Sequence, residues 1–422
     1  MSITIRKFSS VCRADSLAVA LLCLLPLIAV TAPRLLAYLP GLAGLIGVLG
    51  FWVRYKTWPS IPLNLALWLA AFIALAALSS LWAIDPPFAL ERSGKLLPVF
   101  LGGVLVVSFA SHAQPSDIRL FRFLFPVGVL AAGVLCVLNL YAGGALYSIL
   151  HGGEPGDAVN PSFFNRGVVF FTLSLFTAFF ALCASGDAKD RAGRRERFSK
   201  AIGLALGLVS IAILFKTQSQ SAQLALLGGA AAFLLFPYRT KGAWAVLGVL
   251  ITGAMLVLPF AAHAAFQHLA SALYDMAWFS KGYAADRLEI WDYVSRRALE
   301  QPLHGFGIEA TRAITDFDTQ QLYSPTKGVL HPHNFTLQLW IEFGLPGVLL
   351  AGAFIGFILR KIGTLPGRAA RVALATFIAT LCVASTGYGL WQGWWLGSFA
   401  ALAAFTVIAG KMGAVVEAKA EP

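Results

Sequence analysis

Apolar runs long enough to cross a bilayer recur along the whole of this 422-residue chain, and they constrain its fold more than any other feature. A membrane-spanning helix needs roughly 20 apolar residues. The chain is 58% hydrophobic and only 12% charged, whereas soluble domains carry about 25% charged residues. The runs are continuous rather than alternating, which excludes a transmembrane β-barrel. We therefore expect an all-α, polytopic membrane protein.

The runs predict about twelve transmembrane helices. Residues 1–264 are expected to hold the first nine, 265–333 a helical loop, and 334–422 the last three with a tail. A connection as long as 265–333 inside a compact protein is usually functional. The expected spans are 15–33, 36–53, 61–83, 96–112, 122–146, 164–184, 201–216, 219–237, 243–263, 334–357, 370–388 and 394–410.

Basic residues set the expected orientation. The formal net charge is +12, and most Lys and Arg side chains fall on one side of the predicted spans, as in the 186–200 connection. Cytoplasmic loops are enriched in Lys and Arg, so this side is expected to be the cytoplasm, with both termini there. The loop at 265–333 then faces outward. Orientation explains the basic charge without invoking nucleic acid as a partner.

Two patterns that could hold metals are weak. None of the five cysteines forms a CxxC pair, so neither a disulfide framework nor a zinc site is expected. Asp316 and Asp318 form a D-x-D sequence, by which many glycosyltransferases hold a metal, but the pattern also arises by chance in acidic loops. We predict no metal site.

Cations from several separate turns converge on the predicted outer edge of the membrane. Such a cluster suits an anionic group such as a pyrophosphate. A polar turn at 217–222 adds Gln220 at the same edge. The cations are Arg92, Lys95, Arg166, Lys216 and Arg287.

Arg287 directly follows Asp286, which together with Glu289 forms a capping-box pattern. We therefore expect Arg287 at the first position of a helix, where free N–H groups and the helix dipole favour anions. Its planar guanidinium would add a fork suited to phosphate oxygens. A solvated arginine paired with Glu289 or Asp292 is the alternative.

His331, His333 and Asn334 stand at the predicted outer start of the tenth span. A helix N-terminus disfavours a protonated imidazole, so His333 is expected to be neutral. A neutral imidazole can accept a proton and act as a general base. The alternative for His333 is an interfacial cap or anchor, and His331 is either a helper or part of the loop.

Two other features near this edge have structural interpretations that we favour. Glu342 lies within the tenth span and is expected to hold neighbouring helices together, although a carboxylate there is also a functional candidate. The aromatic segment GYGLWQGWW at 387–395 is expected to be an interfacial belt of Trp and Tyr. The alternative for this segment is sugar stacking, with Gln392 as a polar contact.

Several of these segments together resemble the O-antigen ligase and polymerase superfamily. HNFTLQLWIEFGLPG matches its pattern of His, Asn, nine residues and Gly, here His333, Asn334 and Gly344. DRLEIWDYVSRRALEQPLHGFG at 286–307 resembles the family's Arg-Trp-Pro-Leu segment, and FNRG at 164–167 resembles the start of its sixth span. TQSQSA at 217–222 resembles a family turn that often has arginine where this chain has Gln220, and Lys216 could supply the missing charge.

The resemblance implies a metal-independent glycosyltransferase without a cofactor in the bacterial inner membrane. Its donor would be a glycan on undecaprenyl pyrophosphate, and its acceptor the lipid A-core, in the periplasmic leaflet amid membrane lipids. His333 would be the base and Arg287 would hold the leaving group, so both are expected to be catalytic. The residues expected to bind substrate are Arg166, Lys216, Gln220, Asn334, His331, Arg92 and Lys95.

Three other activities remain open from the sequence. An O-antigen polymerase or a protein O-oligosaccharyltransferase would share the histidine motif. A transporter for lipid-linked glycans would need polar groups along a path through the membrane, whereas the polar groups here gather at one edge. We therefore favour the enzyme over the transporter.

Overall fold

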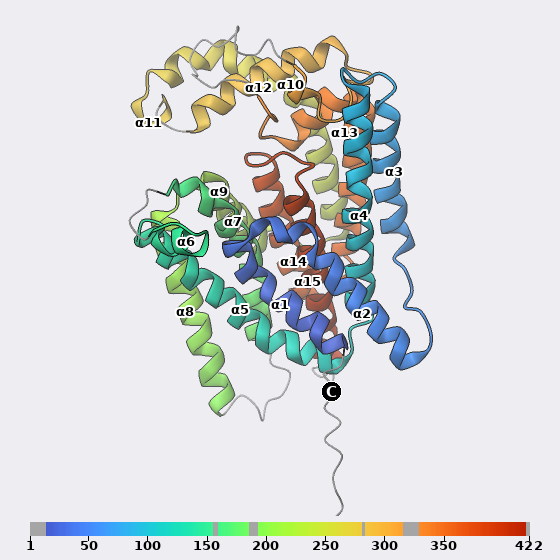
Figure 1. The fold of residues 1–422 in the computed structure, drawn as a ribbon, viewed down its shortest axis with the longest axis vertical. Coiled ribbons are helices and arrows are strands. Elements are labelled where there is room, and N and C mark those ends of the chain that lie inside the picture. The colour runs from blue at the N-terminus through green and yellow to red at the C-terminus, as the bar shows by residue number, and fades with distance from the viewer. Residues whose placement is uncertain (1–13, 155–158, 185–192, 281–282, 315–328, 419–422) are drawn as a thin grey trace, which may run out of the picture.

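The computed structural model describes residues 14–154, 159–184, 193–280, 283–314 and 329–418 (Figure 1). Helices dominate these ranges, which contain no β-strand. The expected all-α, polytopic fold class is confirmed.

Each of the twelve predicted spans falls on one helix of the structure. Among the described residues, nine helices are long and apolar enough to cross a membrane, and α2, α3 and α9 are shorter apolar helices. The number of crossings therefore stays a prediction. The twelve are α1 (Ala14–Thr31), α2 (Leu39–Tyr55), α3 (Leu63–Ser79), α4 (Pro86–Ser111), α5 (Pro115–Tyr141), α7 (Asn165–Cys183), α8 (Arg194–Lys216), α9 (Gln220–Leu235), α10 (Lys241–Tyr274), α13 (Phe335–Ile362), α14 (Gly367–Ala384) and α15 (Gly393–Ala418).

The described part of the segment predicted as a long helical loop is largely helical. α10 runs on to Tyr274, past its predicted end, and α11 (Ala277–Ser280) and α12 (Tyr283–Glu300) follow it. α12 packs on α10 and α13, and these elements cover one end of the bundle, the top in Figure 1, while the C-terminus lies at the opposite end. The division of the chain at residues 264 and 333 stays a prediction. The remaining short elements are η1 (Pro33–Ala37), α6 (Ala145–Leu150), η2 (Pro161–Phe164) and η4 (Ala310–Arg312).

Glycines allow several helices to approach closely. The Cα atom of Gly102 on α4 lies 2.9 Å from where a Cβ of Gly41 on α2 would be. A Cβ on Gly397 of α15 would lie 1.8 Å from the carbonyl oxygen of Leu36 in η1. Helix association in membranes relies on such close backbone contacts between small residues. These glycines therefore fix the packing of α2, α4 and α15.

α13 joins the two ends of the molecule. Its 28 residues would span about 42 Å if the helix were straight, at 1.5 Å per residue. The histidines immediately precede it, and Arg360 and Lys361 lie in its last turn. Arg239 and Lys241, at the start of α10, lie at the same end as Arg360. This distribution agrees with the predicted orientation, which stays a prediction because nothing in the structure identifies the two sides.

Candidate active site at the start of α13

The candidate site is built beside a break in α13. Gly344 has φ 60° and ψ −149°, which interrupts the helix. The Leu345 N–H donates to the Pro302 carbonyl at 2.8 Å, and the Phe306 N–H donates to the Ile341 carbonyl at 2.8 Å. A Cβ at Gly344 would lie 2.5 Å from the Pro302 oxygen. The PLHGFG turn at 302–307 therefore packs directly against the backbone of α13 at Gly344, the glycine of the histidine motif.

Asn334 is the N-cap of α13 and is buried. Its Oδ1 accepts hydrogen bonds from the N–H groups of Thr336 at 2.9 Å and Leu337 at 3.1 Å. Its Nδ2 donates to the Ser385 carbonyl at 3.1 Å. The side chain thus fixes the start of the helix and binds the loop between α14 and α15. Its expected contact with substrate stays a prediction.

His333 lies just before the cap, with a left-handed backbone conformation (φ 54°). Its Nδ1 lies 2.5 Å from the Gly387 carbonyl oxygen. A carbonyl oxygen can only accept, so Nδ1 carries the proton and the Nε2 lone pair is left to accept one. This is the tautomer that a general base requires.

The lowered pKa of His333 agrees with the neutral state that we expect, but its largest cause is burial and not the helix N-terminus. The helix begins at Phe335 with Asn334 as its cap, so His333 is outside the helix. Burial lowers the pKa of His333 most, the hydrogen bond to Gly387 opposes it, and the charge of Arg287 lowers it further. The desolvated ring therefore stays unprotonated to a lower pH than a free histidine.

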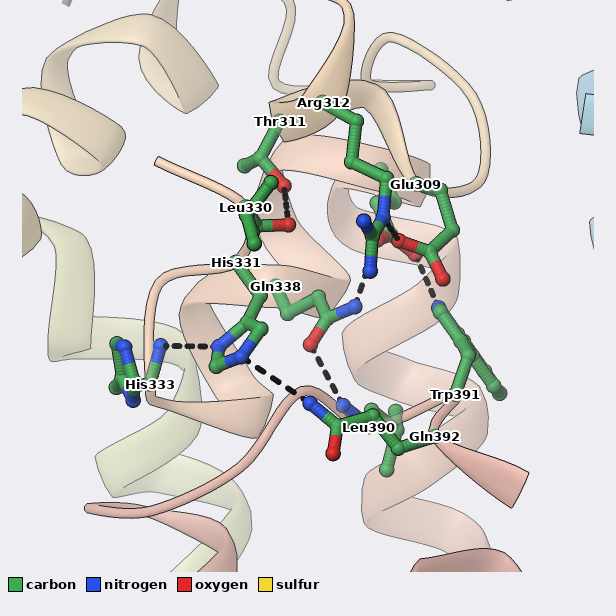
Figure 2. Close-up of polar contacts among 11 residues, drawn as sticks. Glu309, Thr311, Arg312, Leu330, His331, His333, Gln338, Leu390, Trp391 and Gln392 are labelled. Atoms are coloured by element: carbon green, nitrogen blue, oxygen red, sulfur yellow. Dashed lines mark hydrogen bonds and ion pairs between the residues drawn. The ribbon is translucent and has the colours of Figure 1, made fainter. Parts of the chain in front are cut away.

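His331 packs directly against His333, with ring centroids 4.2 Å apart. Figure 2 shows it between His333 and Gln392, whose Nε2 lies 3.2 Å from the Nε2 of His331. A Cβ at Gly389 would lie 2.9 Å from the His331 ring, so only glycine permits this approach. Burial, followed by the charges of His333 and Arg312, lowers the pKa of His331 to about 3.

A buried polar layer lies beside the histidine loop (Figure 2). Gln338 Nε2 donates to Glu342 Oε1 at 2.8 Å, and the indole N–H of Trp391 donates to Glu342 Oε2 at 2.5 Å. The Leu390 N–H donates to Gln338 Oε1 at 2.8 Å. Glu342 is completely buried. These bonds hold the 387–392 loop on α13, so the geometry favours the structural role expected for Glu342.

Arg287 lies near His333, but not where the sequence placed it. α12 begins at Tyr283, so Arg287 is one turn inside the helix and the expected Asp286 cap is wrong. Its charge acts on both His333 and Tyr388. The contribution of Arg287 to an anion site is therefore its own charge and not the dipole of its helix.

Arg166 comes from the first turn of α7 and lies over the indole ring of Trp394, 5.4 Å from its centroid. It faces Tyr388 together with Arg287: burial raises the pKa of Tyr388, and both arginines oppose that rise. Tyr388 was not among the site residues expected from the sequence, because an aromatic segment at a predicted membrane edge indicates an interfacial belt. Arg287 and Arg166 are thus close enough for their charges to act on Tyr388, and the charge of Arg287 also acts on His333.

The other predicted cations lack a described contact with the histidines. Lys95 pairs with Glu91 on the exposed side of α4, and Arg92 lies over the Phe88 ring at 4.5 Å. Lys216 ends α8 and lies over the Tyr141 ring at 5.6 Å. Their roles in substrate binding stay predictions.

The 217–222 turn is joined to the site through a neighbour of Gln220. Gln220 is the exposed first residue of α9. Ser221 Oγ donates to the Thr386 carbonyl at 3.0 Å, and Thr386 Oγ1 donates to Ser221 Oγ at 3.1 Å. Thr386 precedes Gly387, the partner of His333. The turn therefore supports the histidine loop, while direct binding by Gln220 stays a prediction.

No group of three or more His, Cys, Asp or Glu side chains that could hold a metal occurs among the described residues. The D-x-D pair, Asp316 and Asp318, lies outside the part of the chain that the structure describes. The metal-independence of the reaction is therefore left as a prediction.

Comparison with known proteins finds a similarity that includes both the PLHGFG turn and the histidine motif. Residues 204–352 match the family described as O-Antigen ligase. This range contains the 217–222 turn, Arg287, the 302–307 turn and the histidine motif. Over this range, the chain is similar to the O-antigen ligase superfamily.

Two proteins that resemble this chain come from Rickettsia, and the name of each begins "Putative polysaccharide ligase". The Rickettsia conorii protein is 32% identical over 120 residues, 27% of this chain and 29% of the relative. The Rickettsia typhi protein is 30% identical over 152 residues, 35% of this chain and 36% of the relative. The similarity thus spans about a third of each relative. Arg166 and Tyr388 lie outside the range matched by the family.

Proposed function

We propose that this protein is a member of the O-antigen ligase superfamily, and that it transfers a glycan from undecaprenyl pyrophosphate to the lipid A-core in the periplasmic leaflet of a bacterial inner membrane. The observation that carries the proposal is the single fixed tautomer of His333. Nδ1 is bound to Gly387, so Nε2 is the basic nitrogen, and it is within the field of Arg287. A base and a cation side by side suit an acceptor hydroxyl and an anionic leaving group.

In the proposed reaction, His333 Nε2 takes the proton from the acceptor hydroxyl as its oxygen attacks the anomeric carbon. The bond between that carbon and the pyrophosphate oxygen breaks, and the pyrophosphate leaves with the electron pair. Arg287 and Arg166 hold its charge. A single displacement inverts the anomeric configuration, and the proton on His333 is then released to solvent or to the leaving group.

A reconstituted transfer assay tests this function. Purified protein in proteoliposomes receives glycan-linked undecaprenyl pyrophosphate and one of three acceptors: lipid A-core, a second lipid-linked glycan or an acceptor protein. A glycan joined only to lipid A-core supports the ligase. A lengthened lipid-linked glycan would instead indicate a polymerase, and a modified protein an oligosaccharyltransferase. Transfer lost in chelator and restored by magnesium or manganese would contradict the metal-independent mechanism.

A measurement of donor binding separately tests the proposal that Arg287 holds the pyrophosphate leaving group. Hydrogen bonds to charged groups contribute about 1.5–3 kcal/mol, so Arg287→Ala should weaken donor binding by roughly 10–100-fold. Arg287→Lys should recover only part of the loss, because an ammonium keeps the charge but lacks the planar fork. Donor affinity unchanged in Arg287→Ala would remove Arg287 from the pyrophosphate site.

A further inference from the structure

A large hollow lies at the end of the molecule opposite the histidines. Its volume is about 1280 Å³, and it opens between α10, the second half of α13 and the start of α14. Sites for drug-sized ligands have volumes of roughly 300–1,000 Å³. No residue of the candidate active site lines this groove, so the proposed transfer reaction leaves it unexplained.

Glycines on both walls create the groove. A Cβ at Gly253 on α10 or Gly356 on α13 would meet no atom within 4 Å. At Gly352, by contrast, a Cβ would lie 2.6 Å from Thr252, which is the close approach usual for helix packing. Gly253 and Gly356 thus leave open space instead of bringing two helices together. The trough that results is flanked by the exposed apolar side chains of Val249 and Leu349.

The mouth of the groove is cationic. Arg239, Lys241 and Arg360 line it, and all three are exposed. Among the described residues that line the groove, only Glu417 is acidic, and its Oε1 already accepts a hydrogen bond from the Gly367 N–H at 3.0 Å. An apolar trough that ends in three cations matches an amphipathic anion in which a negative group is joined to a hydrocarbon chain.

We propose that this groove binds a phospholipid with a net negative phosphate headgroup. An acyl chain lies in the trough beside Gly253 and Gly356, and the headgroup phosphate contacts Lys241, Arg239 and Arg360. Lys and Arg at a membrane surface attract anionic lipids with about 1 kcal/mol per residue, which favours such a lipid over a zwitterionic one. The site is separate from the proposed donor site and does not depend on the proposed function.

Native mass spectrometry of the full chain in a neutral detergent tests the site. The probes are palmitoyl-oleoyl phosphatidylglycerol, the matching phosphatidylcholine and undecaprenyl phosphate. The wild type should bind one phosphatidylglycerol more tightly than either other lipid. Lys241→Gln with Arg360→Gln should weaken phosphatidylglycerol binding by roughly 30-fold, about fivefold per charge. Lys361→Gln is the matched control, because Lys361 lies over the Phe357 ring and does not line the groove.

Filling the trough gives a second, independent test. Gly253→Leu with Gly356→Leu should abolish the bound lipid, whereas Gly207→Leu on α8, where a Cβ also meets open space, should leave it in place. Equal affinity for the two phospholipids, or lipid retained in the filled variant, would overturn the proposal. Tighter binding of undecaprenyl phosphate would assign the groove to a polyprenyl lipid, and a dimer lost only in the filled variant would assign it to a second copy of the chain; either result also overturns it.

Discussion

The two halves of α13 on either side of Gly344 are built differently. Every residue from 335 to 343 is buried, and the polar side chains of Gln338 and Glu342 are paired within the protein. Residues 345–362 alternate between buried and exposed, and they end in Arg360 and Lys361. The first half is enclosed by the rest of the protein and positions polar groups. The second half resembles an ordinary membrane helix, with one face buried and one face exposed.

The largest expected effect lies at the start of the first half. If His333 is the base, His333→Ala should reduce transfer by about 10²–10⁴-fold, because only Nε2 can take the acceptor proton. Donor binding should change far less, since Arg287 and Arg166 remain. Initial rates and donor affinity measured on the same reconstituted sample distinguish a loss of the chemical step from a loss of donor binding.

His304→Ala provides the matched control for that experiment. His304 is exposed in the 302–307 turn, where its ring lies edge-on to that of Trp82 with 5.8 Å between centroids, and its backbone carbonyl accepts from the Trp82 indole N–H. Its removal should leave the transfer rate within a few-fold of wild type. A comparable rate for His333→Ala would exclude His333 from the mechanism and make the buried half of α13 purely structural.

Two glycine-to-alanine changes in the same helix should have opposite signs. Gly344→Ala forces a side chain into a conformation that only glycine adopts freely and pushes on the Pro302 carbonyl. It should destabilise the protein by about 2–4 kcal/mol. Gly356→Ala meets no atom and improves helix propensity by up to ~1 kcal/mol. Thermal unfolding in detergent measures both, and an equal shift in the two variants would contradict the distinction between the halves.

The fold was predictable because membrane helices follow from local composition. All twelve apolar segments are helices, and Gly344 and the PLHGFG turn were both recognised as motifs. Their docking against each other was not predicted, because a backbone contact between residues 302 and 345 leaves no local pattern. For the same reason, Tyr388 could not be identified from the sequence: the arginines whose charges act on it come from α7 and α12, which are distant in the chain.

Two predictions about the site were inaccurate because the predicted starts of two helices differ from those in the structure. Moving the start of α12 to Tyr283 takes Arg287 away from the helix N-terminus, and moving the start of α13 to Phe335 leaves His333 outside it. The expected neutral histidine was still obtained, because burial acts on its pKa in the same direction as the helix dipole would. Burial depends on the whole fold and could not be derived from the motif.

The polar layer of the first half can be tested by exchanging two side chains. Glu342 accepts from two N–H donors, so Glu342→Gln turns an amide N–H₂ toward a donor and should cost about 1–3 kcal/mol. Gln338→Glu should also destabilise, because it places two carboxyl groups together. The double exchange restores every bond with the roles of the two residues reversed. Its thermal midpoint should therefore recover toward wild type, whereas additive losses would show that the layer does not act as a unit.

The smallest expected effect is a pH dependence that belongs to the histidine loop directly before the first half. Burial lowers the pKa of His331 from the usual 6.5 to about 3. Between these values the unfolded chain binds a proton at His331 that the folded protein does not, so stability should fall as the pH falls from 6.5 toward 3. The lowered pKa of His333 acts in the same direction. His331→Gln should make the decline shallower below pH 6.5 without altering the slope above pH 7.

Residues 345–362 supply the control for this measurement, because Arg360 and Lys361 are their only ionisable side chains and neither titrates in this window. The stability change caused by Gly356→Ala should therefore be the same at pH 7.5 and pH 5, while the difference between His331→Gln and wild type should change by more than the error of the measurement. Unfolding midpoints of the three proteins at the two pH values are sufficient. Parallel curves for His331→Gln and wild type would show that His331 has the same pKa in the folded and the unfolded protein. They would contradict the interpretation that burial keeps its ring neutral at pH 5.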